Sequence, residues 1–460
     1  MYKIDFEKTG YIHFMGIGGI SMSGFAELLH TMGFKITGSD NKESDITKHL
    51  ESLGIHIIYE QVASNITNNM DLVVYTAAIH DDNEEFIAAK EAGIPMMDRA
   101  EMVGQVMKNY SCAIAVSGTH GKTTTTSMIS HIMLAGDLDP TISVGGILKA
   151  IHGNIRIGKS SNFITEACEY TNSFLKFHPT IGVILNVEAE HLDFFKDLKH
   201  IRDSFHSFAS ILPSNGLLVI NGEITNYIEL TQGINCNYVT YGFDNDNYDF
   251  CAKNIVFNDL AYGSFDLYHK GQFIDHLDLQ LIGNHNISNA LAAIAVAFEL
   301  NIPIEQVKEG LSTFTGTNRR FEYKGEIAGV TIIDDYAHHP TEIRATLESA
   351  KNYPCKNMWC VFQPHTYSRT RAFLKDFASA LSSADKIVLA DIYSAREADP
   401  GDISSLDLKA ELEKLGKEVY YFSSFDEIEN FLLENCTNGD LLITMGAGDI
   451  VTIGESLLGI

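Results

Sequence analysis

The stretch Gly118-Thr119-His120-Gly121-Lys122-Thr123 constrains this 460-residue chain more than any other feature. It lies between the apolar run Cys112–Val116 and a helical pattern rich in Thr, Met and Ile. Glycines at such a junction let backbone N–H groups surround phosphate oxygens, and the helix N-terminus adds positive potential. Lys122 can reach the β- and γ-phosphates, and the Thr123 hydroxyl can bind Mg²⁺. The pattern predicts a nucleotide-phosphate loop. The alternative is a chance Gly-Lys-Thr turn, since Val116 replaces the first glycine of the full Walker pattern.

An apolar strand, a glycine or polar turn and a helix follow one another repeatedly along the chain. Strands are expected at 11–15, 34–37, 71–75, 112–116, 181–185, 217–220, 330–333, 358–362, 386–389 and 441–444, and an alanine-rich helix at 286–300. Strands that alternate with helices predict parallel α/β sheets. The length favours about three domains, which the candidate linkers around 105–111 and 315–319 place at 1–107, 108–318 and 319–460.

The composition excludes several classes of protein. With 60 Asp and Glu against 33 Lys and Arg, the net charge is −27, which disfavours binding to nucleic acid or to anionic membranes. No apolar run reaches the ~18 residues of a membrane span, so we expect no membrane insertion. The mixed charges of residues 1–10 do not fit a signal peptide. Seven scattered cysteines without a CxxC pair favour reduced thiols and a cytoplasmic location.

A second glycine turn opens the first predicted helix. Gly16-Ile17-Gly18-Gly19-Ile20-Ser21 is similar to the dinucleotide-binding turn, with Ser21 in place of the third glycine. Asp40 ends the next predicted strand, at about the distance expected for a ribose-contacting carboxylate. The pattern indicates a diphosphate site for a nicotinamide cofactor or for a nucleotide sugar. A tight turn without a ligand is the alternative.

Acidic residues follow two strands of the central part. Glu166 and Glu169 follow one of them, and Glu188, Glu190 and His191 follow the other. Strand ends on one edge of a sheet converge, and carboxylate oxygens are the ligands that Mg²⁺ prefers. We expect Glu169 and His191, ahead of the others, to be the ligands of this metal site. Solvated acidic loops are the alternative.

The last part of the chain carries polar clusters at its strand ends. Asn289 lies inside a helix, where its low propensity favours a base-reading role over a cap. Arg319-Arg320 can bind phosphate or carboxylate, or form surface salt bridges. Asp334-Asp335 and the segment Gln363–Arg371 follow strands, as does the Gly446-Ala447-Gly448-Asp449 turn, which is either a phosphate turn or only a tight turn.

Taken together, these landmarks resemble the Mur ligase family along the whole chain. They are Gly16–Gly19, Gly118–Thr125, Asn186–Asp193, Asn284–Asn289, Arg319–Glu322, Asp334–Pro340 and Phe362–His365. The resemblance implies an α/β fold of three domains. They are an N-terminal Rossmann-like domain for a UDP-sugar, a central P-loop ATPase-like domain with a mostly parallel sheet, and a C-terminal Rossmann-like ligase domain. Cys168 and Thr171 depart from the family pattern, which has Asp at both positions.

The resemblance also implies a reaction. An ATP- and Mg²⁺-dependent ligase would join L-alanine to the carboxylate of UDP-N-acetylmuramate through an acyl phosphate, in peptidoglycan precursor synthesis. We expect UDP-N-acetylmuramate, L-alanine and ATP as partners, and a monomer or weak homodimer. A ligase of the same fold for a preformed peptide, or for glycine or serine, is the near alternative. A nicotinamide oxidoreductase and a non-catalytic nucleotide-binding regulator are the distant ones.

The family's roles carry over to matching positions of this sequence. Catalytic roles fall to Lys122, His338 and Arg369, and metal binding to Thr123, Glu169 and His191. The ATP contacts are Gly118, Thr119, His120, Gly121, Lys122, Thr123, Thr124, Asn289, Arg320 and Asp335. The UDP-sugar contacts are Gly16, Ile17, Gly18, Gly19, Ser39, Asp40, Thr76, His191 and Arg369.

Overall fold

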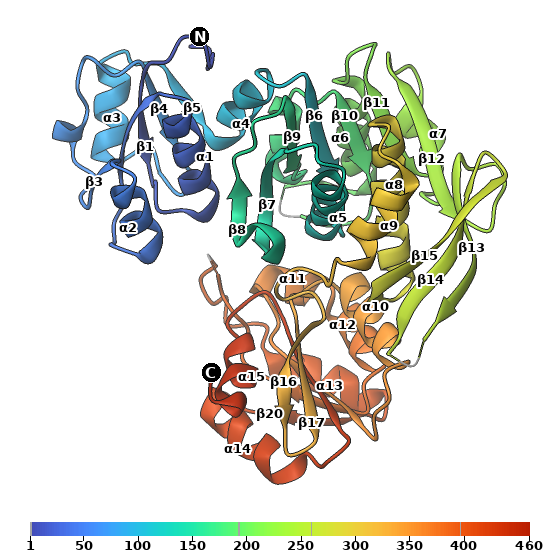
Figure 1. Cartoon of the computed structure of the whole chain (residues 1–460). Coiled ribbons are helices and arrows are strands. Elements are labelled where there is room, and N and C mark those ends of the chain that lie inside the picture. Colours follow the sequence, from blue (N-terminus) through green and yellow to red (C-terminus); the bar gives the residue numbers. More distant parts are fainter. Residues whose placement is uncertain (1, 192–193, 259, 396) are drawn as a thin grey trace. The chain divides into compact units, whose positions relative to one another are not determined.

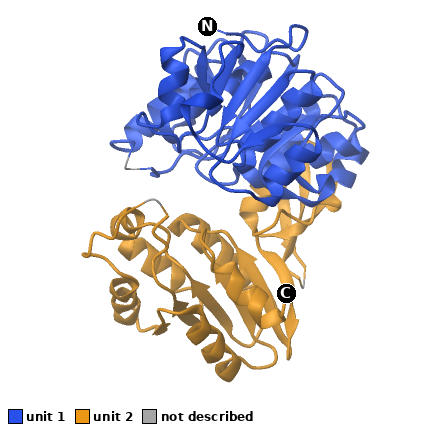
Figure 2. Cartoon of the chain, turned by 90° about the vertical axis from the view of Figure 1, so that its left-hand side faces the viewer, with its two compact units in different colours: residues 1–251, 291–310 blue, residues 252–290, 311–460 orange. Residues whose placement is uncertain are grey.

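The strands gather into three β-sheets within the residues that the computed structural model describes, which are 2–191, 194–258, 260–395 and 397–460 (Figure 1). The chain divides into two compact units (Figure 2). Unit 1 contains residues 1–251 and 291–310, and unit 2 contains residues 252–290 and 311–460. Among the described residues, no helix combines the length and apolar character needed to cross a membrane.

The first sheet of unit 1 is wholly parallel, in the order β3-β2-β1-β4-β5. Its strands are β1 (Tyr11–Met15), β2 (Lys35–Ser39), β3 (His56–Ile58), β4 (Leu72–Tyr75) and β5 (Met96–Asp98). The connecting helices are α1 (Ile20–Thr31), α2 (Asp45–Ser52), η1 (Ala63–Asn65), α3 (Glu84–Glu91) and α4 (Arg99–Met107). The strand order reverses between β1 and β4, and ligands bind open α/β sheets beyond the carboxyl ends of the strands at such a point.

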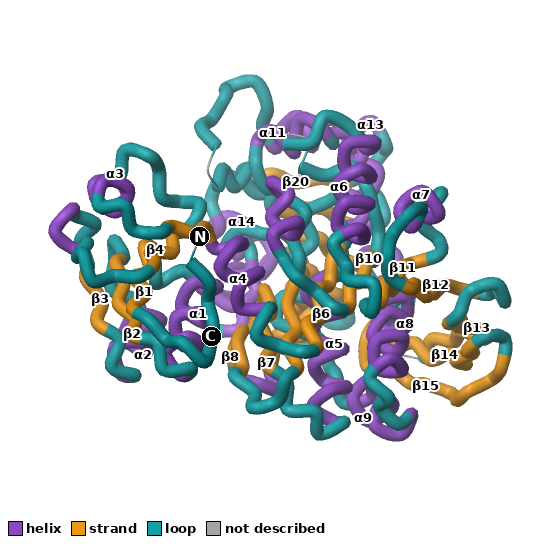
Figure 3. The backbone as a smooth tube through the Cα atoms, turned by 90° about the horizontal axis from the view of Figure 1, so that it is seen from above, coloured by secondary structure: helices purple, strands orange, loops and turns teal. Residues whose placement is uncertain are grey.

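In the second sheet, the strands of unit 1 have the order β12-β11-β10-β6-β9-β7-β8. Figure 3 labels β6, β7, β8, β10, β11 and β12. Its strands are β6 (Cys112–Ser117), β7 (Thr141–Leu148), β8 (Gly153–Arg156), β9 (Asn162–Glu166), β10 (Ile181–Ile184), β11 (Leu217–Asn221) and β12 (Asn237–Phe243). The helices are α5 (Lys122–Ala135), η2 (Lys149–Ile151), η3 (Tyr170–Lys176), α6 (Leu198–Ser210), α7 (Tyr227–Thr231) and α9 (Ile304–Ser312). Because β6 is parallel to both β9 and β10, the segments after these three strands emerge at one edge.

One apolar core joins the two sheets of unit 1. The Phe25 ring from α1 lies 6.4 Å from that of Phe163 in β9, and both side chains are buried. Gly24 of α1 faces Ile155 of β8 so closely that an added Cβ would lie 2.9 Å from the Ile155 Cδ1. Lys176 of η3 also forms an ion pair with Asp98, the N-cap residue of α4. The first two sheets are therefore packed into a single unit.

Unit 2 contains a sheet in the order β16-β17-β21-β18-β19-β20, in which only the β16–β17 pair is antiparallel. Its strands are β16 (Glu322–Ile327), β17 (Val330–Asp335), β18 (Met358–Phe362), β19 (Lys386–Leu389), β20 (Glu418–Tyr421) and β21 (Leu441–Met445). The helices are α10 (Pro340–Ala350), α11 (Tyr367–Ala372), α12 (Leu374–Leu381), α13 (Ser405–Lys414), α14 (Phe425–Asn435) and α15 (Val451–Leu458).

A further group of neighbouring strands precedes this sheet in the chain: β13 (Phe250–Phe257), β14 (Tyr262–His269) and β15 (Gln272–Ile282). β14 and β15 are antiparallel, with two irregularities in their register. The chain then enters α8 (Asn284–Glu299), which matches the helix predicted at 286–300. The sequence pattern did not predict these three strands, because their half-exposed faces interrupt the apolar runs.

Candidate nucleotide and metal site

Two glycines shape the phosphate loop between β6 and α5. Gly118 has φ +145°, and a Cβ there would lie 2.9 Å from the Leu185 Cβ and 3.2 Å from the Asn186 nitrogen. Gly121 has φ +84° and forms the N-cap of α5. L-residues rarely adopt these conformations, so glycine is required at both positions. The predicted turn between a buried strand and a helix is present.

Asn186, two residues after the end of β10, holds this loop in place. Its Oδ1 accepts the His120 N–H at 2.7 Å, and its Nδ2 donates to the His120 carbonyl at 3.0 Å. Its own carbonyl accepts the Thr119 N–H at 3.2 Å. The α5 N-cap has no side-chain hydrogen bond, and the first turn of α5 carries no acidic residue. That turn therefore presents backbone N–H groups to an anion. No feature of the sequence distinguished Asn186 from its neighbours.

Lys122 lies back on the loop that it follows. Its Nζ donates to the carbonyls of Gly118 at 2.5 Å and Thr119 at 3.0 Å, and to Glu169 Oε2 at 3.2 Å. Burial works to lower the pKa of Lys122. The nearby Glu169 carboxylate, helped by Cys168 and Glu190, outweighs burial and raises that pKa above its usual range. Lys122 is therefore a permanent positive charge beside the phosphate loop.

Glu169 offers an oxygen suited to a metal ion. The side chain is only 2% exposed, and its Oε1 has no hydrogen-bond partner among the described residues. His191 Nε2 lies 3.7 Å from that oxygen, and the His191 ring lies against Tyr170 with centroids 4.6 Å apart. A buried carboxylate oxygen without a donor is costly unless a cation or water completes it. The predicted pair of Glu169 and His191 is thus brought together and fits Mg²⁺.

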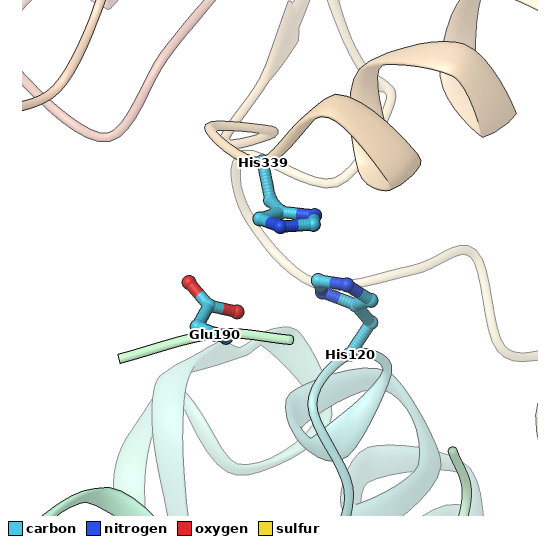
Figure 4. Close-up of side chains that lie close together, drawn as sticks. All are labelled: His120, Glu190 and His339. Atoms are coloured by element: carbon cyan, nitrogen blue, oxygen red, sulfur yellow. The ribbon is translucent and has the colours of Figure 1, made fainter. Parts of the chain in front are cut away.

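The other acidic residues predicted near this site make different contacts. Glu166 Oε1 accepts the Gly145 N–H at 2.5 Å, which ties β9 to β7. His120 and Glu190 project toward one another (Figure 4), and their ligand atoms lie within 4.8 Å. His339, the third residue labelled in that figure, begins α10 in unit 2 as its N-cap. Leu192 and Asp193, the end of one sequence landmark, lie outside the described residues.

A cavity of ≈ 570 Å³ lies at the carboxyl ends of β1 and β4. The predicted residues Gly16, Gly18, Gly19, Asp40 and Thr76 line it. The first turn of α1 has no acidic residue, and its N-cap makes no side-chain hydrogen bond. The geometry suits a diphosphate seated on a helix N-terminus.

Three residues expected to contact the UDP-sugar are buried or already hydrogen-bonded within the protein. Ser39 and Ile17 are 0% exposed, so they support the turn from beneath. One oxygen of Asp40 accepts the Gly18 N–H and the other accepts the Asn41 N–H, each at 2.8 Å. An incoming diphosphate must therefore bind beside the Asp40 carboxylate or replace it as the acceptor of the Gly18 N–H.

The two neighbouring arginines of unit 2 have opposite surroundings. Arg319 donates through Nε to Asp334 at 2.9 Å, through Nη1 to the Gly448 carbonyl at 2.9 Å and through Nη2 to the Gly446 carbonyl at 2.7 Å. Among the described residues, Arg320 has one ion pair, with its Nη1 3.7 Å from Glu342, and its guanidinium lies 5.4 Å from the centre of the Tyr336 ring. Arg319 therefore holds the Gly446–Gly448 turn against β17, whereas Arg320 keeps donors for a ligand.

Two further predicted residues of unit 2 have strongly shifted pKa values. Burial raises the pKa of Asp335 to about 6, even though its oxygens accept the N–H groups of Phe321 and Ala337 at 2.8 Å. Burial, with nearby Arg369 and Arg320, lowers the pKa of His338 to about 3, although the Glu342 carboxylate acts to raise it. His338 Nδ1 lies 3.0 Å from the Tyr336 carbonyl. His338 is thus neutral at physiological pH and acts as a hydrogen-bonding group.

Two more of the predicted residues, Arg369 and Asn289, also lie in unit 2. Arg369 donates to His365 Nδ1 at 3.1 Å, next to the stacked His365 and Tyr393 rings. Asn289 is buried inside α8, and its Nδ2 donates to Asn286 Oδ1 at 3.2 Å. Asn286 in turn donates to the Ile282 carbonyl at 2.9 Å, which fastens the start of α8 to the end of β15.

Comparison with known families decides the relationship of this chain. Models of three domains match in order: "Mur ligase family, catalytic domain" at residues 11–111, "Mur ligase middle domain" at 116–297 and "Mur ligase, glutamate ligase domain" at 319–448. The chain belongs to the Mur ligase family. The family predicted from the sequence landmarks is confirmed, as is the three-domain α/β fold. This family match does not support the alternative of a nicotinamide oxidoreductase, which the Gly16–Gly19 turn alone left open.

Individual Mur ligases match over the full length. The UDP-N-acetylmuramate–L-alanine ligase of Lachnoclostridium phytofermentans is 59% identical over 467 residues, and that of Agathobacter rectalis is 60% identical over 458 residues. Each alignment covers 100% of both chains. The structure of UDP-N-acetylmuramate-alanine ligase from Thermotoga maritima matches with a TM-score of 0.80 and 30% identity over 98% of both chains. A murein peptide ligase from Psychrobacter arcticus, at 23% identity and a TM-score of 0.70 over 98% of both chains, shares the fold.

Proposed function

We propose that this chain joins L-alanine to the lactyl carboxylate of UDP-N-acetylmuramate at the expense of ATP, in peptidoglycan precursor synthesis. The observation that carries the proposal is the pair of full-length relatives of that name at 59% and 60% identity. Two anion-binding turns on separate sheets of unit 1 support it, because the reaction needs one nucleotide to give a phosphoryl group and another to receive it. The phosphate loop after β6 suits ATP, and the cavity beyond β1 and β4 suits the UDP-sugar.

The reaction asks the protein for alignment and charge neutralisation. The sugar carboxylate attacks the ATP γ-phosphorus, ADP leaves, and an acyl phosphate forms. The alanine amine then attacks the acyl carbon, loses a proton, and displaces inorganic phosphate. Lys122 neutralises charge on the transferring phosphoryl group, and no covalent enzyme nucleophile is needed. Mg²⁺ held by Glu169, Thr123 and His191 would supply further neutralisation of the ATP phosphates.

The remaining residue roles belong to the same proposal. Asn289, Arg320 and Asp335 contact the ATP base, phosphates and ribose, His338 donates or accepts at the reacting groups, and Arg369 binds the acyl phosphate or the sugar nucleotide. The open donors of Arg320 support its phosphate role, and the neutral state of His338 makes it a hydrogen-bonding group. Each oxygen of Asp335 already accepts one backbone N–H group, so a ribose hydroxyl would donate to the lone pairs that remain on these oxygens.

Three broader parts of the proposal concern the chain as a whole. We place its functional domains at 1–107, 108–318 and 319–460, and expect a monomer or weak homodimer. A cytoplasmic location fits the nucleotide substrates and the seven cysteines, all of which are free thiols. Sedimentation velocity of the purified chain tests the oligomeric state directly.

A substrate panel tests the reaction. Purified protein is given ATP, Mg²⁺, UDP-N-acetylmuramate and one of L-alanine, glycine, L-serine or a tripeptide, and ADP and phosphate release are measured. We expect L-alanine to give the highest kcat/KM and a product heavier by one alanyl residue in mass spectrometry. Turnover with the tripeptide alone would overturn the alanine assignment. Binding of both nucleotides without any ADP release would indicate a non-catalytic regulator.

A further inference from the structure

A fully buried histidine–glutamate pair lies inside the first sheet of unit 1. His13 of β1 and Glu85 of α3 are both 0% exposed, and His13 Nε2 lies 2.8 Å from Glu85 Oε1. The His13 Nδ1 lies 2.8 Å from the Thr37 hydroxyl of β2. Neither residue lines the cavity for the UDP-sugar. Burying such a pair is costly unless hydrogen bonds satisfy it, so its presence calls for a reason.

Glu85 gathers donors from three other elements. Ser39 at the end of β2 donates its hydroxyl to Glu85 Oε2 at 2.6 Å, and Asn65 of η1 donates to Oε1 at 3.1 Å. With His13 from β1, the carboxylate joins β1, β2, η1 and α3 at one point. Both oxygens are therefore fully engaged inside the protein.

The network continues from Glu85 to the glycine turn through Ser39. The Ser39 carbonyl accepts the N–H of Gly16 at 2.9 Å and the N–H of Ile17 at 3.0 Å. Gly16 lines the cavity, and the turn sets the direction of the N–H groups at the start of α1. The Ser39 side chain and its carbonyl thus connect the buried carboxylate to the anion-binding turn.

The backbone of Glu85 is also bound to a wall of the cavity. Asn83 lines the cavity and caps α3 by accepting the N–H groups of Glu85 at 3.0 Å and Phe86 at 3.1 Å. Asn83 also donates to Gln61, another lining residue, at 2.9 Å. Glu85 is therefore fixed at the first turn of the helix that positions this wall.

We propose that Glu85, held by His13 and linked to the turn by Ser39, is a positioning residue that preorganises the cavity of the first sheet for the diphosphate of the nucleotide sugar. The inference rests on the proposed function for its ligand. A turn that is already ordered loses less conformational entropy when it binds, so the network contributes affinity without touching the ligand. The ATP loop lies on the other sheet and does not share these contacts.

Two small changes test the role. Glu85→Gln keeps the shape but offers an N–H₂ group where the carboxylate accepted a donor, and Ser39→Ala removes the connecting hydroxyl alone. We expect each variant to raise the KM for UDP-N-acetylmuramate by about tenfold, the size of one lost buried hydrogen bond. The kcat and the KM for ATP should stay within about twofold of wild type. Calorimetric titration with UDP should show the same loss of affinity.

Asn109→Ala is the matched control. Asn109 holds the N-terminal segment by accepting the Phe6 N–H at 3.0 Å and donating to the Ile4 carbonyl at 2.9 Å, away from the cavity. It should lower thermal stability and leave the KM for the UDP-sugar unchanged. An unchanged KM in Ser39→Ala, or an equal rise in Asn109→Ala, would overturn the positioning role. If Glu85→Gln does not fold, Ser39→Ala still decides the question. Wild-type protein that fails to bind the UDP-sugar would instead refute the proposed function.

Discussion

The amine of Lys122 lies 3.2 Å from one oxygen of Glu169, while the other oxygen of the same carboxylate has no hydrogen-bond partner among the described residues. One buried carboxylate thus serves two purposes. It keeps the lysine charged and in place, and it presents a bare oxygen to a cation. When ATP binds, its phosphates compete with the Gly118 and Thr119 carbonyls for the lysine donors.

Replacing Lys122 with alanine should slow ligation severely without affecting the sugar site. We expect kcat to fall by about 10²- to 10³-fold, because a fixed charge beside the transferring phosphoryl group is lost. Affinity for UDP-N-acetylmuramate should remain within about twofold, since its cavity lies on the first sheet. ADP release and calorimetric titration measure the two effects. Lys199→Ala, at an exposed lysine of α6, is the control. A parallel loss of sugar binding would contradict separate sites.

Removing the charge of Glu169 should weaken the metal site. In Glu169→Gln the bare oxygen loses its negative charge, so the Mg²⁺ concentration for half-maximal activity should rise by at least about tenfold. The titration is done at saturating ATP, with Glu229→Gln as the control because that residue is exposed. A Mg²⁺ titration identical to wild type would remove Glu169 from the proposed ligands.

The strands and turns were predictable because each local signal agreed with the fold. Buried parallel strands produce unbroken apolar runs, and both glycine turns follow such runs. Which side chains contact one another in the fold was not predictable. The sequence cannot tell which of two adjacent arginines folds inward, because Arg319 meets Gly446 and Gly448 only when β17 and β21 pair. Glu85 was missed for the same reason, since its partners His13 and Ser39 are distant in the chain.

Exchange of Arg319 for lysine should destabilise unit 2. A lysine ammonium cannot reproduce the planar fork that reaches Asp334 and two carbonyls at once. We expect a loss of about 2 kcal/mol in the free energy of unfolding, which thermal melting should detect. Arg320→Lys should change the melting temperature much less and should mainly raise the KM for ATP. Equal melting temperatures for the two variants would contradict the different roles of the pair.

The buried Asp335 should make stability depend on pH between 4 and 6. Burial raises its pKa from 3.8 to about 6 in the folded chain, so the fold favours the protonated acid. This contribution to stability is fully present below pH 4 and is lost as the pH rises through 6. The pKa of Asp335 differs by about two pH units between the folded and the unfolded chain, which corresponds to roughly 3 kcal/mol.

Asp335→Asn cannot ionise. The free energy of unfolding of wild type minus that of Asp335→Asn, measured with urea at each pH, should therefore fall between pH 4 and 6 and then level off. Burial raises the pKa of Asp334 as well, but that residue is present in both proteins and cancels in the difference. Two parallel stability curves would mean that Asp335 has the same pKa in the folded and the unfolded chain, and that its two backbone N–H donors offset its burial.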